Sequence, residues 1–410
     1  MRILSVGSRY PPDGGGGYER LWIAAVAALR AAGHHVQVLT TRPPAGGAAL
    51  AGAVAAPPDD PRVRRELDWY WRDGAFPPRT PAAVIRTERA NARTWDRTVA
   101  AVAPDAVLWM AMGGMSLSLL GRARAQRLPA VAVIADDWLN YGPRVDGLTR
   151  RLPGPLRRPG AALLARLLAL GPGPGLAAGS GATPGPGLRV SFISAFLRDA
   201  ARAGGGWDGS AWIDHPGVDP ARFAPAPAAA AWRGRLLYCG RLDPRKGVAD
   251  AIAALTRLPG AVLTVDGDGP ANERERLRAL AARHGVAARV RWACSPPDQV
   301  AAAYAAADAV LFPVTWPEPW GLVPLEAMAT GRPVIVTAAG GGIAEYARDG
   351  ENALVAAAGD PGALAAAVVR LASDPGLRER LVTGGRATAA GLTEAAWCAA
   401  VRAHLEAVAR

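Results

Sequence analysis

The stretch RILSVGSRYPPDGGGGYERLWIAAVAALRAAGHHVQVLT, residues 2–40, decides the fold of the first half of the chain. The apolar run Arg2–Gly7 is typical of a short strand, and a glycine run, Gly14–Gly17, separates it from a helical pattern over Tyr18–Ala32. A glycine ends that helix, and His35–Thr40 has the composition of a second strand. This βαβ unit predicts two parallel strands joined by a crossover helix.

Short apolar strands recur along the rest of the chain, separated by stretches long enough for helices. The further strand candidates are Ala106–Met110, Ala130–Ala135, Leu188–Ile193, Ala211–Asp214, Leu236–Cys239, Ala261–Asp266, Val290–Ala293, Ala309–Phe312 and Pro333–Thr337. Strands that alternate with helices predict a parallel, doubly wound sheet in each half. We therefore predict an α/β fold with two Rossmann-like domains.

The length of 410 residues also favours two domains. The stretch PGVDPARFAPAPAAAAWR, Pro216–Arg233, is rich in Pro and Ala and has no periodicity, which is typical of a linker. We predict a first domain over 1–216, a linker over 217–234 and a second domain over 235–388. Thr393–Arg410 is helical in composition, and we expect the C-terminal segment 389–410 to form a helix that packs back on the first domain.

Composition narrows the class of protein. Half of the residues are hydrophobic and only 20% are charged, which excludes a disordered chain. The three cysteines have no C-x-x-C spacing, so neither a disulfide framework nor a zinc site is expected. The N-terminus, MRILSVGS, lacks the apolar core and cleavage site of a signal peptide, which predicts a cytoplasmic protein.

The net charge of +12 raises the question of a polyanionic partner. The arginines are scattered rather than clustered, so we expect no nucleic-acid partner, and phosphorylated substrates, anionic lipids or an acidic carrier remain. Residues 150–187 contain the apolar run AALLARLLAL, Ala161–Leu170, with arginines upstream. This stretch predicts either peripheral contact with the inner membrane face or, as the simpler alternative, a loop and a packed helix.

One basic residue differs from all the others. Of the 47 Lys and Arg residues, Lys246 is the only lysine. Lysine carries a compact, flexible charge that suits phosphate binding, although a single lysine can also fall at a position by chance.

Two loops carry residues suited to phosphate chemistry. The glycine-rich loop Asp13–Gly17 lies between a strand and a helix, where backbone N–H groups face an anion, but glycine runs also form plain turns. The segment CGRLDPRKG, Cys239–Gly247, follows a strand and places Arg241 and Lys246 at the carboxyl edge of the second sheet, where open α/β sheets bind ligands. Two cations there can neutralise a diphosphate, or they can be solvated charges on a turn.

Two carboxylates lie eight residues apart in PEPWGLVPLE, residues 317–326. Glu318 is in a Pro-rich loop after a strand, and Glu326 is about one turn into the next helix. The loop acid can bind sugar hydroxyls and the helix acid a ribose diol, while backbone N–H groups of the helix start can bind phosphate. Capping by Glu318 and surface exposure of Glu326 are the alternatives.

These motifs resemble glycosyltransferase family 4. The resemblance rests on GRLDPRKG, on the segment with the two glutamates, and on VDGDGP, YAAADAVLFP and DGENALV at 265–270, 304–313 and 349–355. It is dense over 235–356 and sparser over 40–230, and PPDGGGGYER and GHHVQVLTT also resemble the family's first glycine loop and second strand. It implies the GT-B fold, in which an acceptor-binding first domain and a nucleotide-sugar-binding second domain face each other across a cleft.

The resemblance also implies a reaction: retaining, metal-independent transfer of a sugar, of the hexosyltransferase type, from a nucleotide-diphosphate sugar. Arg241 and Lys246 would stabilise the leaving diphosphate, Glu318 would hold the sugar and Glu326 the ribose. The implied donor-binding residues are Gly15, Gly16, Gly240, Arg241, Lys246, Cys294, Glu318, Trp320, Gly321, Leu322, Val323 and Glu326. No cofactor or metal is implied. Asp266 and Asp268 have the spacing of a metal-binding pair but fall where the family has a glycine turn, so we predict a turn.

One departure from the family concerns the acid/base group. Many members have a histidine where this chain has Asp136 and Asp137, after the strand that ends near Ala135. Either carboxylate can accept a proton from the acceptor or can cap the next segment. A nucleotide-sugar epimerase and a binding-only homologue without catalysis are the alternative functions.

The acceptor stays open between saccharide, lipid-linked, natural-product and carrier-bound molecules. The loops at 55–80 and 138–187 are the least family-like parts of the chain, and the first contains Trp69, Tyr70 and Trp71. These aromatic residues can stack on an acceptor or can pack in the interior.

Overall fold

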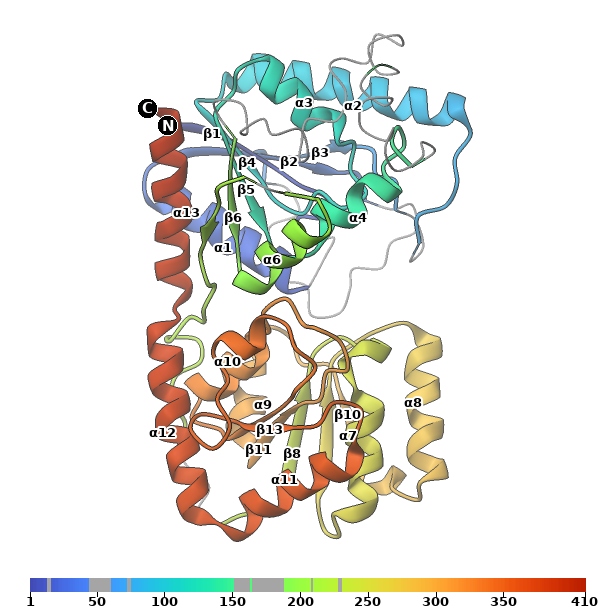
Figure 1. The fold of residues 1–410 in the computed structure, drawn as a ribbon, viewed down its shortest axis with the longest axis vertical. Helices are drawn as coiled ribbons and strands as arrows, with labels where there is room; N and C mark the ends of the chain where they lie inside the picture. The colour runs from blue at the N-terminus through green and yellow to red at the C-terminus, as the bar shows by residue number, and fades with distance from the viewer. Residues whose placement is uncertain are drawn as a thin grey trace. The chain divides into compact units, whose positions relative to one another are not determined.

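The structure is a computed structural model that describes residues 1–12, 16–43, 60–71, 75–150, 163, 188–207, 209–227 and 231–410. Its described residues form two compact units. The first contains the described residues up to His215 together with Cys398–Arg410, and the second runs over Pro216–Trp397. Each unit is an α/β structure around its own parallel sheet (Figure 1).

The first unit has a seven-stranded sheet in the order β3-β2-β1-β4-β5-β6-β7, and all neighbouring strands are parallel. Its strands are β1 (Arg2–Val6), β2 (His35–Thr41), β3 (Val63–Leu67), β4 (Ala106–Trp109), β5 (Ala130–Ile134), β6 (Leu188–Phe192) and β7 (Trp212–Ile213). The strand order reverses direction between β1 and β4, and doubly wound sheets bind ligands at the carboxyl ends of the strands at such a point.

Helices cover this sheet. They are α1 (Gly17–Ala31), α2 (Pro81–Val102), α3 (Ser118–Ala125), α4 (Trp138–Val145) and α6 (Ala195–Ala203). In α1 the buried side chains recur at helical spacing, Leu21, Ala25 and Leu29 among them, so that one face packs on the sheet. This confirms the βαβ opening expected over residues 2–40.

The C-terminal helix α13 (Glu394–Ala409) returns to the first unit, as predicted, and it begins one residue after Thr393, where the helical composition starts. His404 Nε2 lies 2.8 Å from Asp214 Oδ2, and its ring stacks on Trp212 with a centroid distance of 3.6 Å. The chain thus ends against the last strand of the first sheet.

The second unit has a six-stranded parallel sheet in the order β10-β9-β8-β11-β12-β13. Its strands are β8 (Arg235–Cys239), β9 (Val262–Asp266), β10 (Val290–Ala293), β11 (Ala309–Phe312), β12 (Val334–Thr337) and β13 (Leu354–Ala356). The central strands β11 and β12 are buried along their whole length, as expected for a parallel sheet covered on both faces.

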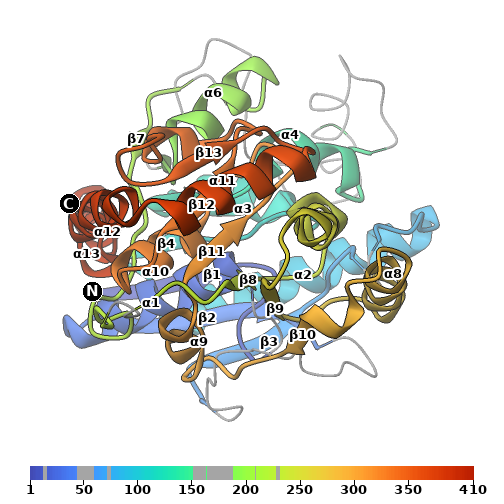
Figure 2. The same ribbon diagram turned by 90° about the horizontal axis from the view of Figure 1, so that it is seen from below.

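Six helices of the second unit cover the two faces of its sheet. They are α7 (Val248–Ala254), α8 (Ala271–Arg283), α9 (Val300–Ala306), α10 (Leu322–Ala329), α11 (Pro361–Ser373) and α12 (Pro375–Gly391). Helices α8, α7 and α11 lie side by side on one face, and α9, α10 and α12 lie on the other (Figure 2). The predicted fold class, α/β with two Rossmann-like domains and a returning C-terminal helix, is confirmed.

The described part of the predicted linker packs against the second unit. Phe223 is buried and meets Tyr304 edge to face at a centroid distance of 5.8 Å. The Ala226 N–H donates to the carbonyl of Thr330 at 3.1 Å. Pro- and Ala-rich composition therefore marks a segment without helix or strand here, but one that is held in place.

Candidate functional site

The loop that follows β8 is built to present Lys246. A 3-10 turn at Pro244–Lys246 begins with Asp243, whose side chain accepts the Arg245 N–H at 3.0 Å and pairs with the Arg245 guanidinium at 3.0 and 2.7 Å. Gly247 ends the turn with φ +70°, and a Cβ there would lie 1.7 Å from the Pro313 carbonyl oxygen. Only glycine allows this close approach, which fixes where Lys246 leaves the backbone.

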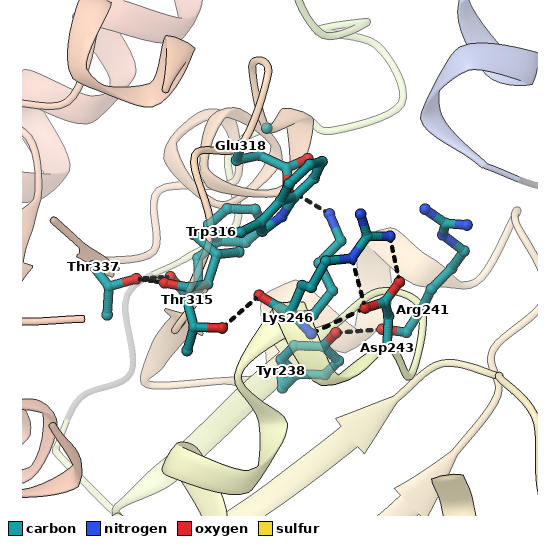
Figure 3. Close-up of polar contacts among 12 residues, drawn as sticks. Tyr238, Arg241, Asp243, Lys246, Thr315, Trp316, Glu318 and Thr337 are labelled. Carbon is teal, nitrogen blue, oxygen red and sulfur yellow. Dashed lines mark hydrogen bonds and ion pairs between the residues drawn. The ribbon is translucent and has the colours of Figure 1, made fainter. Parts of the chain in front are cut away.

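Lys246 and Glu318, which sequence analysis placed in one site, meet in the structure. Lys246 Nζ lies 2.6 Å from Glu318 Oε2, and the two side chains are only 14% and 13% exposed (Figure 3). The indole N–H of Trp316 donates to the same oxygen at 2.7 Å. Trp316 was missed by the sequence analysis, since nothing in its spacing distinguishes it from a packing residue.

Arg241 lies beside this pair without joining it. Its side chain is exposed and has no partner within the described ranges, while its carbonyl accepts the Tyr238 hydroxyl at 2.6 Å. The pKa of Asp243 is lowered to about 2, mainly by the hydrogen bond from Arg245, and the charge of Arg241 adds to the effect. The carboxyl edge of β8 thus presents the Arg241 guanidinium, which no described residue pairs with, on the same side as the Lys246 ammonium (Figure 3). Gly240, with φ +142°, supplies the bend between β8 and this loop.

Helix α10 begins next to Glu318 and is not capped by a side chain. Its N-cap, Gly321, has φ +86°, and the N–H groups of Leu322 and Val323 have no partner in the described part of the chain. Such a helix start binds anions through its free N–H groups and its dipole. The Glu318 backbone is fixed by a bridge to Gly341, where a Cβ would lie 2.2 Å from the Glu318 carbonyl oxygen.

Trp320 and Glu326 point into the interior of the second unit. Trp320 is 2% exposed, and its indole N–H donates to the Pro216 carbonyl at 2.8 Å. Glu326 is 0% exposed and accepts the Tyr304 hydroxyl at 2.7 Å, which excludes the alternative of a surface glutamate. Sequence analysis missed Tyr304, which is 22 residues away in the chain.

Cys294 directly follows β10 and is exposed. The next N–H, that of Ser295, donates to Asp266 Oδ1 at 2.7 Å, and Asp266 Oδ2 is buried with no partner in the described part of the structure. Asp268 instead pairs with Arg274. The two aspartates therefore have different partners in the structure, and the interpretation of this segment as a turn stays a prediction. Among the described residues no group of three His, Cys, Asp or Glu side chains could hold a metal ion.

In the first unit, Gly16 is the N-cap of α1, and no side chain of a described residue caps this helix start either. The predicted Gly15, with the rest of 13–15, lies outside the described residues. Tyr18, in the first turn of α1, donates its hydroxyl to the Val133 carbonyl at 2.5 Å and so ties the helix start to β5. The start of α1 and the end of β5 therefore lie together at one edge of the sheet.

Asp136 and Asp137 follow β5 and differ from each other. Asp136 is half-buried and accepts the Tyr141 hydroxyl on Oδ2 at 2.9 Å and the Trp138 N–H on Oδ1 at 3.3 Å. Burial raises the pKa of Asp136 to about 6. Asp137 is exposed as a residue and accepts from the Asn140 amide at 2.6 Å. Partial desolvation of its carboxyl group still raises its pKa. A carboxyl group with a pKa near neutrality is suited to proton transfer, and of the two this is Asp136.

Comparison with known proteins assigns the second unit to a family. Residues 230–388 match the family model "Glycosyl transferases group 1". The second unit is a group 1 glycosyltransferase domain. The chain is 43% identical over 195 residues to a D-inositol 3-phosphate glycosyltransferase of Acidothermus cellulolyticus, an alignment that covers 42% of this chain and 43% of that protein. It is 38% identical over 177 residues to a glycogen synthase of Mycobacterium tuberculosis, which covers 42% of each chain. The chain thus spans less than half of the length of these curated relatives.

Solved structures extend the likeness to the whole fold. A sucrose-phosphate synthase of Thermosynechococcus elongatus superposes with a TM-score of 0.72 at 19% identity and covers 100% of this chain and 99% of that one. Anabaena Alr3699/HepE, solved in complex with UDP and glucose, gives a TM-score of 0.68 at 18% identity over 99% of each chain. The two-domain GT-B fold that the resemblance implies is therefore confirmed. No helix of the described residues is both long and apolar enough to cross a membrane.

Proposed function

We propose that this chain transfers a sugar from a nucleotide-diphosphate sugar to an acceptor, with retention of the anomeric configuration and without a metal ion. The observation that carries the proposal is the contact of 2.6 Å between Lys246 and Glu318, which joins the loop after β8 to the loop before α10. A cation and a carboxylate at one point suit a ligand with a charged diphosphate next to a neutral sugar. The similarity to glycosyltransferases supports the same reaction class.

Three kinds of hydrogen-bond donor would bind the diphosphate: an ammonium, a guanidinium and backbone N–H groups. Lys246 uses one of its three ammonium protons on Glu318, and Leu322 and Val323 offer N–H groups. The Arg241 guanidinium has no partner among the residues that the structure describes. When the bond between the sugar C1 and the phosphate oxygen breaks, negative charge grows on the diphosphate. Preorganised cations and N–H groups stabilise that charge more than they stabilise the ground state.

Glu318 would bind the sugar. Its Oε2 accepts from Lys246 and Trp316, while Oε1 has no partner in the described structure and is available to a sugar hydroxyl. Glu326 is assigned to the ribose by resemblance. Its carboxylate is bonded to Tyr304 and covered, so contact with a ribose requires the side chain to turn outward.

The acceptor loses a proton as its oxygen bonds to C1. Asp136, with a pKa of about 6, is the favoured proton acceptor, and Asp137 and the donor phosphate are the other candidates. The acceptor itself is proposed only as a saccharide, a lipid-linked molecule, a natural product or a carrier-bound molecule. Cytoplasmic location and peripheral membrane contact through 150–187 stay proposals, and this stretch lies outside the described residues except for 150 and 163.

The test is incubation of the purified protein with UDP-, ADP-, GDP- and TDP-sugars in the presence of EDTA, followed by thermal shift and by NMR of released or transferred sugar. Release or transfer with the donor's anomeric configuration supports the proposal. Conversion of one donor into another favours the epimerase, and a thermal shift without turnover favours the binding-only homologue. Lys246→Met should abolish the response, whereas Arg283→Met, an exposed cation at the end of α8, should not.

A further inference from the structure

Trp316 contacts Glu318 but has no role in the function proposed above. It lies in PVTWPEPWG, residues 313–321, between β11 and α10, and its side chain is half-buried. We infer that Trp316 is a positioning residue that holds Glu318 for the sugar of the donor and thereby distinguishes a nucleotide sugar from a free nucleotide. The inference rests on the proposed function.

The hydrogen bonds of Glu318 are asymmetric. Lys246 Nζ at 2.6 Å and Trp316 Nε1 at 2.7 Å both reach Oε2 (Figure 3). Two donors on one oxygen fix the rotation of the carboxylate and leave the lone pairs of Oε1 for a ligand. The fixed carboxylate is therefore oriented before any sugar arrives, which reduces the entropy lost on binding.

The indole ring is itself held in place. The Arg245 guanidinium lies 4.4 Å from the ring centroid of Trp316, within the range of a cation–π contact. Arg245 is in turn held by its two bonds to Asp243, and its carbonyl accepts the N–H of Thr315 at 2.9 Å. The loop after β8 thus fixes the ring whose N–H fixes Glu318.

A bound diphosphate would affect the two hydrogen-bond donors to Glu318, Lys246 and Trp316, in different ways. The Lys246 ammonium sits on a flexible stem and is attracted to phosphate, so a bound diphosphate competes with Glu318 for it. The indole N–H of Trp316 is neutral and rigid, and phosphate does not draw it away. Trp316 therefore keeps Oε2 bonded when Lys246 turns to the diphosphate, and Glu318 stays oriented toward the sugar.

The experiment uses Trp316→Phe, which keeps an aromatic face for Arg245 and removes the indole N–H together with the five-membered ring that carries it. Isothermal titration calorimetry compares wild type and variant with three pairs of probes: UDP and UDP-glucose, ADP and ADP-glucose, and GDP and GDP-mannose. For the pair that the wild type binds, we expect the affinity for the nucleotide sugar to fall about tenfold and that for the free diphosphate to change less than about twofold, as for one lost hydrogen bond to a charged group. With turnover, KM for the donor should rise in parallel.

The matched control is Trp292→Phe. Trp292 is also half-buried under an arginine, with Arg278 at 5.6 Å from its ring centroid, but it lies in β10. It should leave the ratio of the two affinities unchanged. Arg245→Ala removes the cation–π contact that holds the Trp316 ring and leaves Glu318 itself unchanged. It should shift the ratio of the affinities for nucleotide sugar and free diphosphate in the same direction as Trp316→Phe, by a smaller factor.

The outcomes separate the two proposals. If the wild type binds none of these nucleoside diphosphates and none of these nucleotide sugars, the proposed function fails and the inference fails with it. If the wild type binds a pair and Trp316→Phe weakens both members equally, or neither, then only the inference is overturned.

Discussion

The raised pKa of Asp136 leads to a prediction about the stability of the protein that can be tested without a substrate. Its ordinary value of 3.8 is raised to about 6, mainly by burial, and the charges of Asp137 and Glu19 act in the same direction. A group that binds its proton more tightly in the folded state stabilises the fold at low pH and loses that effect as the pH rises. The free energy of unfolding should therefore fall between about pH 4 and pH 6 because of this one group.

The magnitude follows from the two pKa values. Each pKa unit corresponds to about 1.4 kcal/mol, so the ionised Asp136 costs the folded state about 3 kcal/mol at pH 8. Asp136→Asn removes this cost but weakens one of the bonds to Tyr141 and Trp138, by about 1 kcal/mol at either pH. The variant should therefore be more stable than the wild type at pH 8, by about 2 kcal/mol, and slightly less stable at pH 4.

The assay is urea denaturation of wild type and variant at pH 4 and pH 8. At each pH, the free energy of unfolding of the wild type is subtracted from that of the variant. The change in this difference between pH 4 and pH 8 is the quantity to compare, because the cost of the weakened hydrogen bond is the same at both pH values and cancels. Asp137→Asn, at the exposed neighbouring position, is the matched control and should give a smaller change. Parallel pH dependence of wild type and Asp136→Asn would refute the assignment of a raised pKa to Asp136. If Asp136 is also the proton acceptor, turnover of the wild type should rise with pH through about 6, and the variant should lack this rise.

Three further substitutions test the geometry of the second unit. Lys246→Met should abolish diphosphate binding and lower the free energy of unfolding by about 1–3 kcal/mol, because Glu318 loses its cation; retained calorimetric binding of the diphosphate would contradict the site. Gly247→Ala should cost more than about 2 kcal/mol in urea denaturation, since its Cβ would lie 1.7 Å from a carbonyl oxygen at a φ of +70°; a neutral effect would show that the loop can move. Tyr304→Phe should lower the free energy of unfolding by about 1–3 kcal/mol, because buried Glu326 loses a hydrogen-bond donor; unchanged stability would contradict the contact between the two side chains.

Local patterns in the sequence predict the strands that are buried on both faces and the helices between them. The strands at 106–110, 130–135 and 309–312 are found within one residue of β4, β5 and β11, because a strand covered on both faces must be apolar throughout. The strand β3, Val63–Leu67, was missed. Its sequence, VRREL, is largely charged, and as the edge strand of the first sheet it is only partly buried, so no hydrophobic pattern marks it.

The site was predictable to the extent that its residues follow strands. Arg241, Lys246 and Glu318 come after β8 and β11, which are neighbours in the sheet, and parallel strands bring their carboxyl ends to one edge. The contacts of the two glutamates were not predictable in this way. Trp316 and Tyr304 reach the glutamates only because their side chains point toward them. That direction depends on how the loop and the helix pack, and spacing in the sequence does not reveal it.

The place of Lys246 explains why a chain so rich in arginine keeps one lysine there. The ammonium reaches Glu318 Oε2 while lying 5.6 Å from the ring centroid of Trp316 and 6.0 Å from that of Phe312, in a space bounded by two aromatic rings and one carboxylate. A guanidinium would bring five N–H groups to a position where one carboxylate oxygen and two ring faces are the partners at hand, and the unmatched donors would be costly. The ammonium fits that space, keeps two protons for a ligand, and can move toward a phosphate. Arg241, at the exposed position beside it, meets none of these restrictions, and there the chain uses arginine.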